Sequence, residues 1–210
     1  MGTLSEQQQP KARKDEILDV ATHLFAERGY EGTSMNDVAE RVGMRKASLF
    51  YHFATKDSLY ESVLERLIQR LATALSAAYD GSGSFGERLE AAADVLATVL
   101  AQRPFAARLL MREAIDWGPT VRGGAVGPLM RALEASAAFI RAGQDAGEFI
   151  AGDAKQIVLT TFGVHFLPFA IGQVVERYVG TSPFDPGFVA ARCAEIRKNV
   201  RQILVHEAAG

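Results

Sequence analysis

The spacing of the apolar residues is the feature that most limits what this chain can fold into. From residue 11 onward, apolar side chains recur three and four positions apart almost throughout, and no convincing alternation of apolar and polar residues occurs. Spacings of three and four place apolar residues on one face of a helix, whereas a half-buried strand needs a spacing of two. The sequence therefore predicts an all-α protein of about nine helices. Their expected ranges are 11–28, 34–41, 45–52, 56–79, 86–102, 104–116, 125–146, 154–179 and 186–206.

Composition and charge exclude several classes of protein. The 210 residues are 48% hydrophobic and 23% charged, with a net charge of -2, so a surface for nucleic acid would have to be local. Cys193 is the only cysteine, which excludes an intramolecular disulfide, and the four histidines lack metal-ligand spacing. We expect no metal and no cofactor. The N-terminus has no apolar stretch, and no apolar run approaches the roughly 18 residues of a membrane span, so we expect a cytoplasmic protein without a membrane partner.

Residues 34–52 carry the most specific pattern. Ser34 fits a helix N-cap with Asp37 three residues later, and Gly43 permits a tight turn after the short helix. A second short helix is expected from Arg45, with Leu49 and Phe53 turned inward. Two short helices joined by a glycine turn indicate a helix-turn-helix, whose second helix enters the major groove of DNA.

Positive charge is concentrated over the same residues. The stretch from Arg41 to Lys56 contains four Lys or Arg residues and no Asp or Glu, whereas segment 11–70 as a whole carries ten basic and ten acidic residues. Attraction to phosphates supplies much of the affinity of such DNA-binding modules. Four cations could also form a plain solvated face, but the cap, the turn and the aromatic cluster 50–53 favour DNA binding.

Residues 17–59, ILDVATHLFAERGYEGTSMNDVAERVGMRKASLFYHFATKDSL, resemble the DNA-binding domain of the TetR family of transcription regulators. The segment AGQDAGEFIAGD, residues 142–153, resembles a helix junction in the larger domain of that family. The resemblance implies a homodimer that binds a palindromic operator in double-stranded DNA and responds to a small-molecule effector, most often as a repressor that the effector releases. It also implies that the last two long helices pair between subunits. The expected domains are a disordered tail over 1–10, a helix-turn-helix domain over 11–55, and a ligand-binding and dimerisation domain over 56–210, with helix 56–79 linking the two.

The resemblance also suggests which residues contact DNA. Ser34 would cap its helix and offer its backbone N–H to a phosphate, with Thr33 beside it. The start of the second short helix would face base edges, its end would contact phosphates or thymine methyls, and Lys56 would bind a phosphate. Phe50 departs from the tyrosine that the family often has and cannot hydrogen-bond a phosphate. The expected DNA-binding residues are Thr33, Ser34, Arg45, Lys46, Ala47, Ser48, Tyr51, His52 and Lys56.

The larger domain should hold an effector between its helices, in a pocket that is mostly apolar. Pro168 should kink the helix predicted over 154–179, which makes residues 162–169 the expected pocket wall. We expect an apolar or amphipathic effector whose polar end, preferably anionic, is fixed by Arg112 or His165. Phenylalanines at helical spacing could instead be plain core, His165 a core histidine, and Arg112, Glu113 and Asp116 an exposed ion-pair face. The candidate lining residues are Phe105, Leu109, Arg112, Trp117, Phe139, Phe162, His165, Phe166 and Phe169.

Two other classes of protein remain as alternatives. A helical-bundle enzyme would need a catalytic motif, and the sequence has no GxSxG, HExxH or glycine-rich phosphate loop, so we expect no catalytic residues. An interaction protein that has lost DNA binding is disfavoured by the cations Arg45, Lys46 and Lys56. For the dimer, the last helix offers one apolar stripe, which comprises Val189, Cys193, Ile196, Val200, Ile203 and Leu204.

Overall fold

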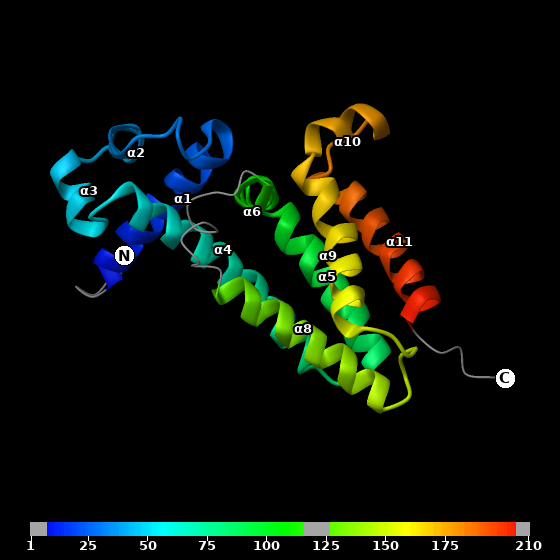
Figure 1. The fold of residues 1–210 in the computed structure, drawn as a ribbon. Helices are drawn as coiled ribbons and strands as arrows, with labels where there is room; N and C mark the ends of the chain where they lie inside the picture. The colour runs from blue at the N-terminus through cyan, green and yellow to red at the C-terminus, as the bar shows by residue number, and fades with distance from the viewer. Residues whose placement is uncertain (1–7, 116–126, 205–210) are drawn as a thin grey trace, which may run out of the picture. The chain divides into compact units, whose positions relative to one another are not determined.

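A computed structural model describes residues 8–115 and 127–204 of the chain, with the side chains of residues 12–115 and 127–201. Its regular structure is helical, which confirms the predicted all-α class, and eight of the nine predicted ranges each hold one helix (Figure 1). The helices are α1 (Gln8–Arg28), α2 (Met35–Val42), α3 (Lys46–His52), α4 (Lys56–Tyr79), α5 (Phe85–Ala101), α6 (Ala106–Ile115), α8 (Gly127–Asp145), α9 (Ala154–Ala170), α10 (Gly172–Val179) and α11 (Pro186–Leu204).

The described residues fall into two compact units. The first contains residues 8–67 and 108–115, and the second contains residues 68–107 and 127–204. The division lies within α4, after Leu67, and within α6, before Arg108, so each of these helices continues from one unit into the other. Trp117 lies outside the described residues.

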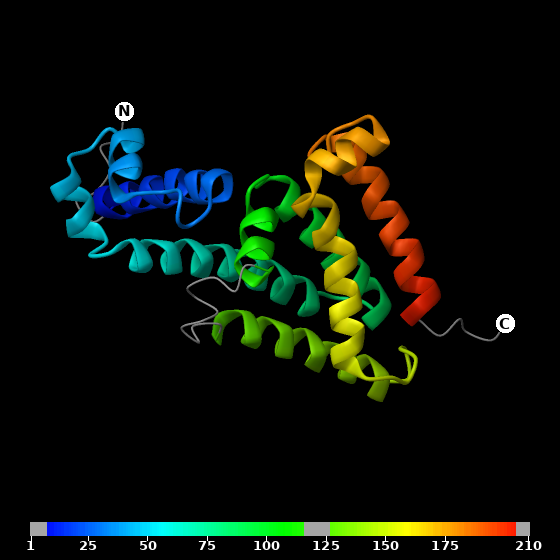
Figure 2. The ribbon, with the colours of Figure 1, turned by 45° about the horizontal axis from the view of Figure 1, so that its top comes forward.

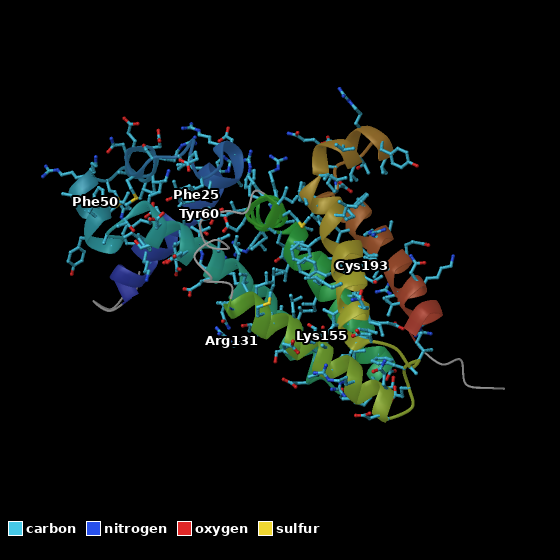
Figure 3. All side chains as sticks on the ribbon, in the orientation of Figure 1. Phe25, Phe50, Tyr60, Arg131, Lys155 and Cys193 are labelled. Carbon is cyan, nitrogen blue, oxygen red and sulfur yellow. The ribbon has the colours of Figure 1, made fainter. Side chains whose placement is uncertain are left out.

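The first unit is built around the apolar faces of α1, α2, α3 and the first half of α4. Phe25 of α1 meets Tyr60 of α4 edge to face, with 4.8 Å between ring centroids. Figure 3 labels both residues. Gly29 ends α1 with a φ of 78°, a left-handed conformation that favours glycine. The fully enclosed core side chains include Ile17, Leu24, Phe25, Val38, Leu49 and Leu59.

In the second unit, α5 packs against both α9 and α11, and α8 packs on α9 (Figures 1 and 2). The turn after α8 folds Phe149 back onto Gly143, where a Cβ atom would lie 2.2 Å from the Phe149 ring. A side chain at Gly143 is therefore excluded, which gives a packing reason for the glycine of the segment AGQDAGEF. The core here includes Leu89, Ala137, Phe139, Ile140, Phe149, Val158, Ile196 and Val200.

The prediction of one helix over 154–179 is wrong. The helix ends at Ala170, and α10 leaves at 79° to α9. Pro168 has no N–H for the carbonyl of Val164, and Arg192 of α11 donates to that carbonyl from Nη2 at 2.7 Å. Among the described helices, none alone is long and apolar enough to cross a membrane, although the bent pair α9 and α10 together reaches that length and composition.

The apolar stripe predicted as the dimer surface of the last helix is buried inside the chain instead. Cys193, Ile196 and Val200 are at most 8% exposed, because this face of α11 packs on α5. Val189 is half-buried, and the side chains of Ile203 and Leu204 lie outside those described. The exposed side chains of α11 include the small residues Ala190, Ala191 and Ala194. This expectation therefore needs correction: an apolar stripe on a terminal helix can complete the chain's own core.

Candidate nucleic-acid interface

The cap of α2 sets the geometry of the helix-turn-helix. The Ser34 hydroxyl accepts from the backbone N–H of Asp37 at 3.2 Å, and Asp37 Oδ2 accepts from the Ser34 backbone N–H at 2.8 Å. These reciprocal bonds form the predicted capping box. Hydrogen bonds from the Ser34 hydroxyl and backbone N–H hold the pKa of Asp37 below its ordinary value, so the carboxylate stays charged at the helix N-terminus.

Gly43 closes the other end of α2 in a left-handed conformation, with a φ of 70°. The N–H of Met44 donates to the carbonyl of Ala39 at 2.9 Å, and that of Gly43 donates to Glu40 at 3.1 Å. These two bonds satisfy carbonyls that the end of a helix leaves open. The turn then delivers the chain directly into α3, so the spacing between α2 and α3 is fixed by local hydrogen bonds.

Helix α3 presents nearly all of its side chains to solvent. All seven of its residues are described, and Leu49 is the only buried one among them. Phe53, the residue directly after the helix, is also buried, with 4% of its surface exposed. Tyr51 is 89% exposed, and Figure 3 shows Phe50 on the same short helix. The exposed side chains at and around α3 are Arg45, Lys46, Ala47, Ser48, Phe50 and Tyr51, with His52 half-buried. A helix with so little buried surface is suited to insertion into a partner.

The cations of this surface lie where α3 begins. Lys46 Nζ lies 5.7 Å from the centre of the Phe50 ring. Arg45 occupies the N-cap position of α3, and its side chain makes no capping hydrogen bond within the described helix. Arg41 at the end of α2 is exposed as well. Arg45, Lys46, Ala47 and Ser48 are therefore brought together at one helix N-terminus, as the sequence predicted, and their contacts with DNA remain a prediction.

Two of the predicted DNA residues have other partners in this structure. Thr33 is 1% exposed, and its hydroxyl donates to the carbonyls of Gly29 at 2.9 Å and Leu24 at 3.2 Å. The Thr33 side chain therefore holds α1 to the start of α2 and is not available to DNA. The backbone N–H of Ser34, expected to meet a phosphate, donates to Asp37 in the capping box.

Lys56 also has a structural role that the sequence did not reveal. Its Nζ donates to the carbonyl of Tyr30 at 2.9 Å and lies 4.0 Å from the centre of the Tyr30 ring. The Tyr30 hydroxyl in turn donates to Asp57, the next residue of α4. These contacts attach the N-terminus of α4 to the segment between α1 and α2. Lys56 would therefore have to bind a phosphate in addition to Tyr30, or leave Tyr30 to do so.

The described candidate effector residues are divided between the two units of the chain. Phe162 and Phe166 stack on α9 with 3.8 Å between centroids, and Phe169 lies 6.0 Å from Phe184. Phe139 belongs to the core of the second unit, where it stacks on Tyr79 at 4.2 Å. Phe105 is half-buried in the second unit, whereas Leu109 and Arg112 belong to the first. Their roles as ligand contacts stay predictions.

His165 has an environment that suits a neutral ring. The side chain is 1% exposed, and its Nδ1 lies 2.7 Å from the carbonyl of Thr161, one turn earlier on α9. Burial lowers the pKa of His165, and the positive charge of Arg192 acts in the same direction. A neutral imidazole cannot fix an anion through charge, which weakens the expectation that His165 holds an anionic end of the effector.

Sequence reasoning missed a buried contact between α6 and α4. Glu113 was considered for an exposed ion-pair face, yet it is 6% exposed and accepts a hydrogen bond from the Tyr60 hydroxyl at 2.8 Å. The neighbouring Arg112 guanidinium lies 3.5 Å from the position that a Cβ on Gly29 would occupy. Helix α6 thus meets the end of α1 and the start of α4. The signal in the sequence that could have revealed this contact was Glu113, an acidic residue at an otherwise apolar position of its helix.

Sequence comparison with known proteins supports the resemblance to the TetR family. Residues 17–63 match the family described as bacterial regulatory proteins, tetR family. The biofilm operon icaADBC HTH-type negative transcriptional regulator IcaR of Staphylococcus aureus is 54% identical over 48 residues, which are 23% of this chain and 26% of that relative. The chain thus matches about a quarter of the length of this curated relative.

Solved structures extend the likeness to the whole fold. The TetR family transcriptional regulator PfmR from Thermus thermophilus has a TM-score of 0.72 at 21% identity, covering 91% of this chain and 99% of that one. The ketosteroid transcriptional regulator KstR2 of Mycobacterium tuberculosis has a TM-score of 0.67 at 18% identity, covering 98% of both chains. At these identities the likeness concerns the fold.

Proposed function

We propose that this chain is a repressor of transcription of the TetR family, and that a small-molecule effector releases it from its operator. The surface of α3 carries the proposal. It offers Arg45, Lys46, Ala47 and Ser48 at the N-terminus of a short exposed helix, held by Leu49 behind a capped α2. Such a helix places its first residues against base edges in the major groove, while nearby cations neutralise phosphates.

The experiment is a titration of labelled random-sequence duplex DNA at several salt concentrations. Replacing Arg45 or Lys46 by alanine should lower the affinity and reduce the salt slope by about one unit for each phosphate that the variant no longer neutralises. Arg131→Ala on α8 removes an exposed cation from the second unit and serves as the control (Figure 3). Equal affinities and slopes for all four proteins would contradict DNA binding through α3.

A dimer follows from the need to read two half-sites with one short helix each. With the stripe of α11 used inside the chain, α9 offers exposed apolar side chains for an interface. Leu159 is 56% exposed and Leu167 is 52% exposed, and the exposed alanines of α11 would allow a second copy to approach closely. We therefore assign the subunit interface to the outer faces of α9 and α11.

We also place the proposed regulator in the cytoplasm, because a bacterial regulator must reach chromosomal DNA.

The contact between α6 and α4 suggests how an effector would act on the DNA-binding surface. An effector changes DNA affinity only if it binds two conformations differently. Helix α6 continues from the second unit into the first, where Glu113 accepts from Tyr60 on α4, and Tyr60 packs edge to face on Tyr30 at 5.0 Å. A shift of α6 on effector binding would act on Tyr60 and then on the Tyr30–Lys56 contact at the start of α4.

A further inference from the structure

The start of α1 carries positive charge that lies outside the helix-turn-helix. Lys11, Arg13 and Lys14 are three basic residues within four positions of the sequence. The charge of Arg13 is already paired, because its Nη1 lies 2.6 Å from Glu16 Oε2. Lys14 is exposed and forms no ion pair within the part of the chain that the structure describes. Among the described side chains of this segment, Lys14 is therefore the cation whose charge remains for a partner.

A contact with Phe53 places Lys14 beside the end of α3. Lys14 Nζ lies 5.5 Å from the centre of the Phe53 ring, within the roughly 6 Å of a cation–π contact. Phe53 directly follows α3 and is buried, so its ring is a fixed part of the first unit. Figures 1 and 2 both show the start of α1 close to the end of α3. The Lys14 ammonium group is thereby held next to the residue that follows His52.

The contact with the ring leaves the hydrogen-bond donors of Lys14 available. An aromatic face attracts a positive charge but does not take an ordinary hydrogen bond, so the three N–H groups of the ammonium can still bind an anion. Lys56 differs in this respect, because its Nζ donates to the carbonyl of Tyr30 at 2.9 Å. Lys14 can therefore bind an anion without giving up a hydrogen bond to the chain, whereas Lys56 cannot donate that same N–H elsewhere.

The length of α3 indicates what Lys14 would meet on DNA. The helix has seven residues and is about 10 Å long, which is comparable to the roughly 12 Å width of the major groove. When Arg45 and Lys46 at the start of α3 face base edges, the other end of the helix approaches the phosphates that border the groove. A cation held beside that end lies nearer to the DNA backbone than to the bases.

We propose that Lys14 binds a DNA phosphate at the border of the major groove, so that the start of α1 and α3 form one DNA-binding surface. The inference rests on the proposed function and adds to it a residue outside the helix-turn-helix. An ammonium group binds a phosphate as a point charge, and a phosphate contact positions the protein without reading sequence. Lys14 should therefore strengthen binding to every duplex, whatever its sequence.

The test titrates labelled random-sequence duplex DNA with the full-length protein at salt concentrations from about 50 mM to about 200 mM. Lys14→Ala should weaken binding at the lowest concentration and reduce the salt slope by about one unit for each bound subunit. Over this range the wild-type protein should therefore lose about fourfold more affinity per subunit than the variant. Arg131→Ala removes an exposed cation of α8 (Figure 3) and should keep the wild-type slope.

Two further variants separate the charge of Lys14 from its packing on Phe53. Lys14→Met keeps a flexible side chain against the ring but has no charge, so it should bind DNA as weakly as Lys14→Ala. Lys14→Arg keeps the charge and should bind with an affinity and a salt slope close to those of the wild type. A purely structural role would give the opposite result for Lys14→Met, which would then bind like the wild type. Thermal unfolding of each variant confirms that it is folded.

A wild-type affinity and slope in folded Lys14→Met, or an equal loss in Arg131→Ala and Lys14→Ala, would overturn the inference. Arg45→Ala and Lys46→Ala are titrated in the same series. If these two variants lose affinity and slope while Lys14→Met does not, this inference alone falls. If the wild-type protein does not bind the duplex, or if all variants bind it equally, the proposed function falls as well.

Discussion

Leu49 and Lys56 show how single side chains position the DNA-binding surface. Leu49 is completely buried and attaches a seven-residue helix that could not persist alone in water. Lys56 was predicted from its place in the sequence as a phosphate ligand, and the structure gives it a hydrogen bond and a ring contact with Tyr30. The sequence could indicate which residues are cationic, but it could not tell an engaged cation from an exposed one, because the partner lies 26 residues away.

This difference leads to a stability prediction for two lysines. Lys56→Ala removes a cation–π contact and a hydrogen bond, so the free energy of unfolding should fall by about 1–2 kcal/mol. Lys46→Ala removes an exposed side chain and should change stability by less than about 0.5 kcal/mol. Denaturant unfolding measures both values. A similar decrease in the two variants would contradict the structural role assigned to Lys56.

Secondary structure was predictable wherever local signals agreed, and less so where packing between distant segments decides. The cap at Ser34, the turn at Gly43 and the helical spacing placed α1 to α6 within a few residues. The break after α9 was expected only as a kink at Pro168, because the arginine that takes the freed Val164 carbonyl lies 28 residues later. The apolar stripe of α11 gave no sign whether α5 or a second copy would cover it.

The two capping boxes provide a matched comparison between elements. Ser34 and Ser84 cap α2 and α5 with the same pair of reciprocal bonds, to Asp37 and Glu87 respectively. Replacing either serine by alanine should lower the stability of its helix by about 1 kcal/mol. Only Ser34→Ala should also weaken DNA binding, because α2 supports α3.

The comparison is made by thermal unfolding together with a DNA titration of each variant. An equal decrease of DNA affinity in Ser34→Ala and Ser84→Ala would mean that general destabilisation, rather than the placement of α3, controls binding.

At the scale of the whole molecule, one short exposed helix can contact only a few base pairs, so we expect the proposed function to depend on assembly into a dimer. The exposed apolar face of α9 is the proposed subunit interface, where its leucines would meet those of a second copy across a twofold axis. We therefore expect assembly and DNA binding to be linked, although the proposed surfaces lie in different units of the chain.

Leu167→Glu should disrupt this interface by placing a charge in its apolar centre. Light scattering should return twice 22.7 kDa for the wild-type protein and 22.7 kDa for the variant at micromolar concentration. Met130→Glu adds the same charge at a residue of α8 that is 45% exposed and should leave the dimer intact. A monomeric wild type, or a dimeric Leu167→Glu protein, would place the interface elsewhere.

The central claim, DNA reading by a twofold pair of α3 helices, is tested most directly by selecting bound sequences from a pool of random duplex DNA and sequencing them. The wild-type protein should enrich an inverted repeat whose half-site centres lie about 10 base pairs, or a multiple of that distance, apart. The double variant Arg45→Ala, Lys46→Ala should enrich no such repeat. If the wild-type protein enriched no sequence, or if the double variant enriched the same repeat, the account given for α3 would be contradicted.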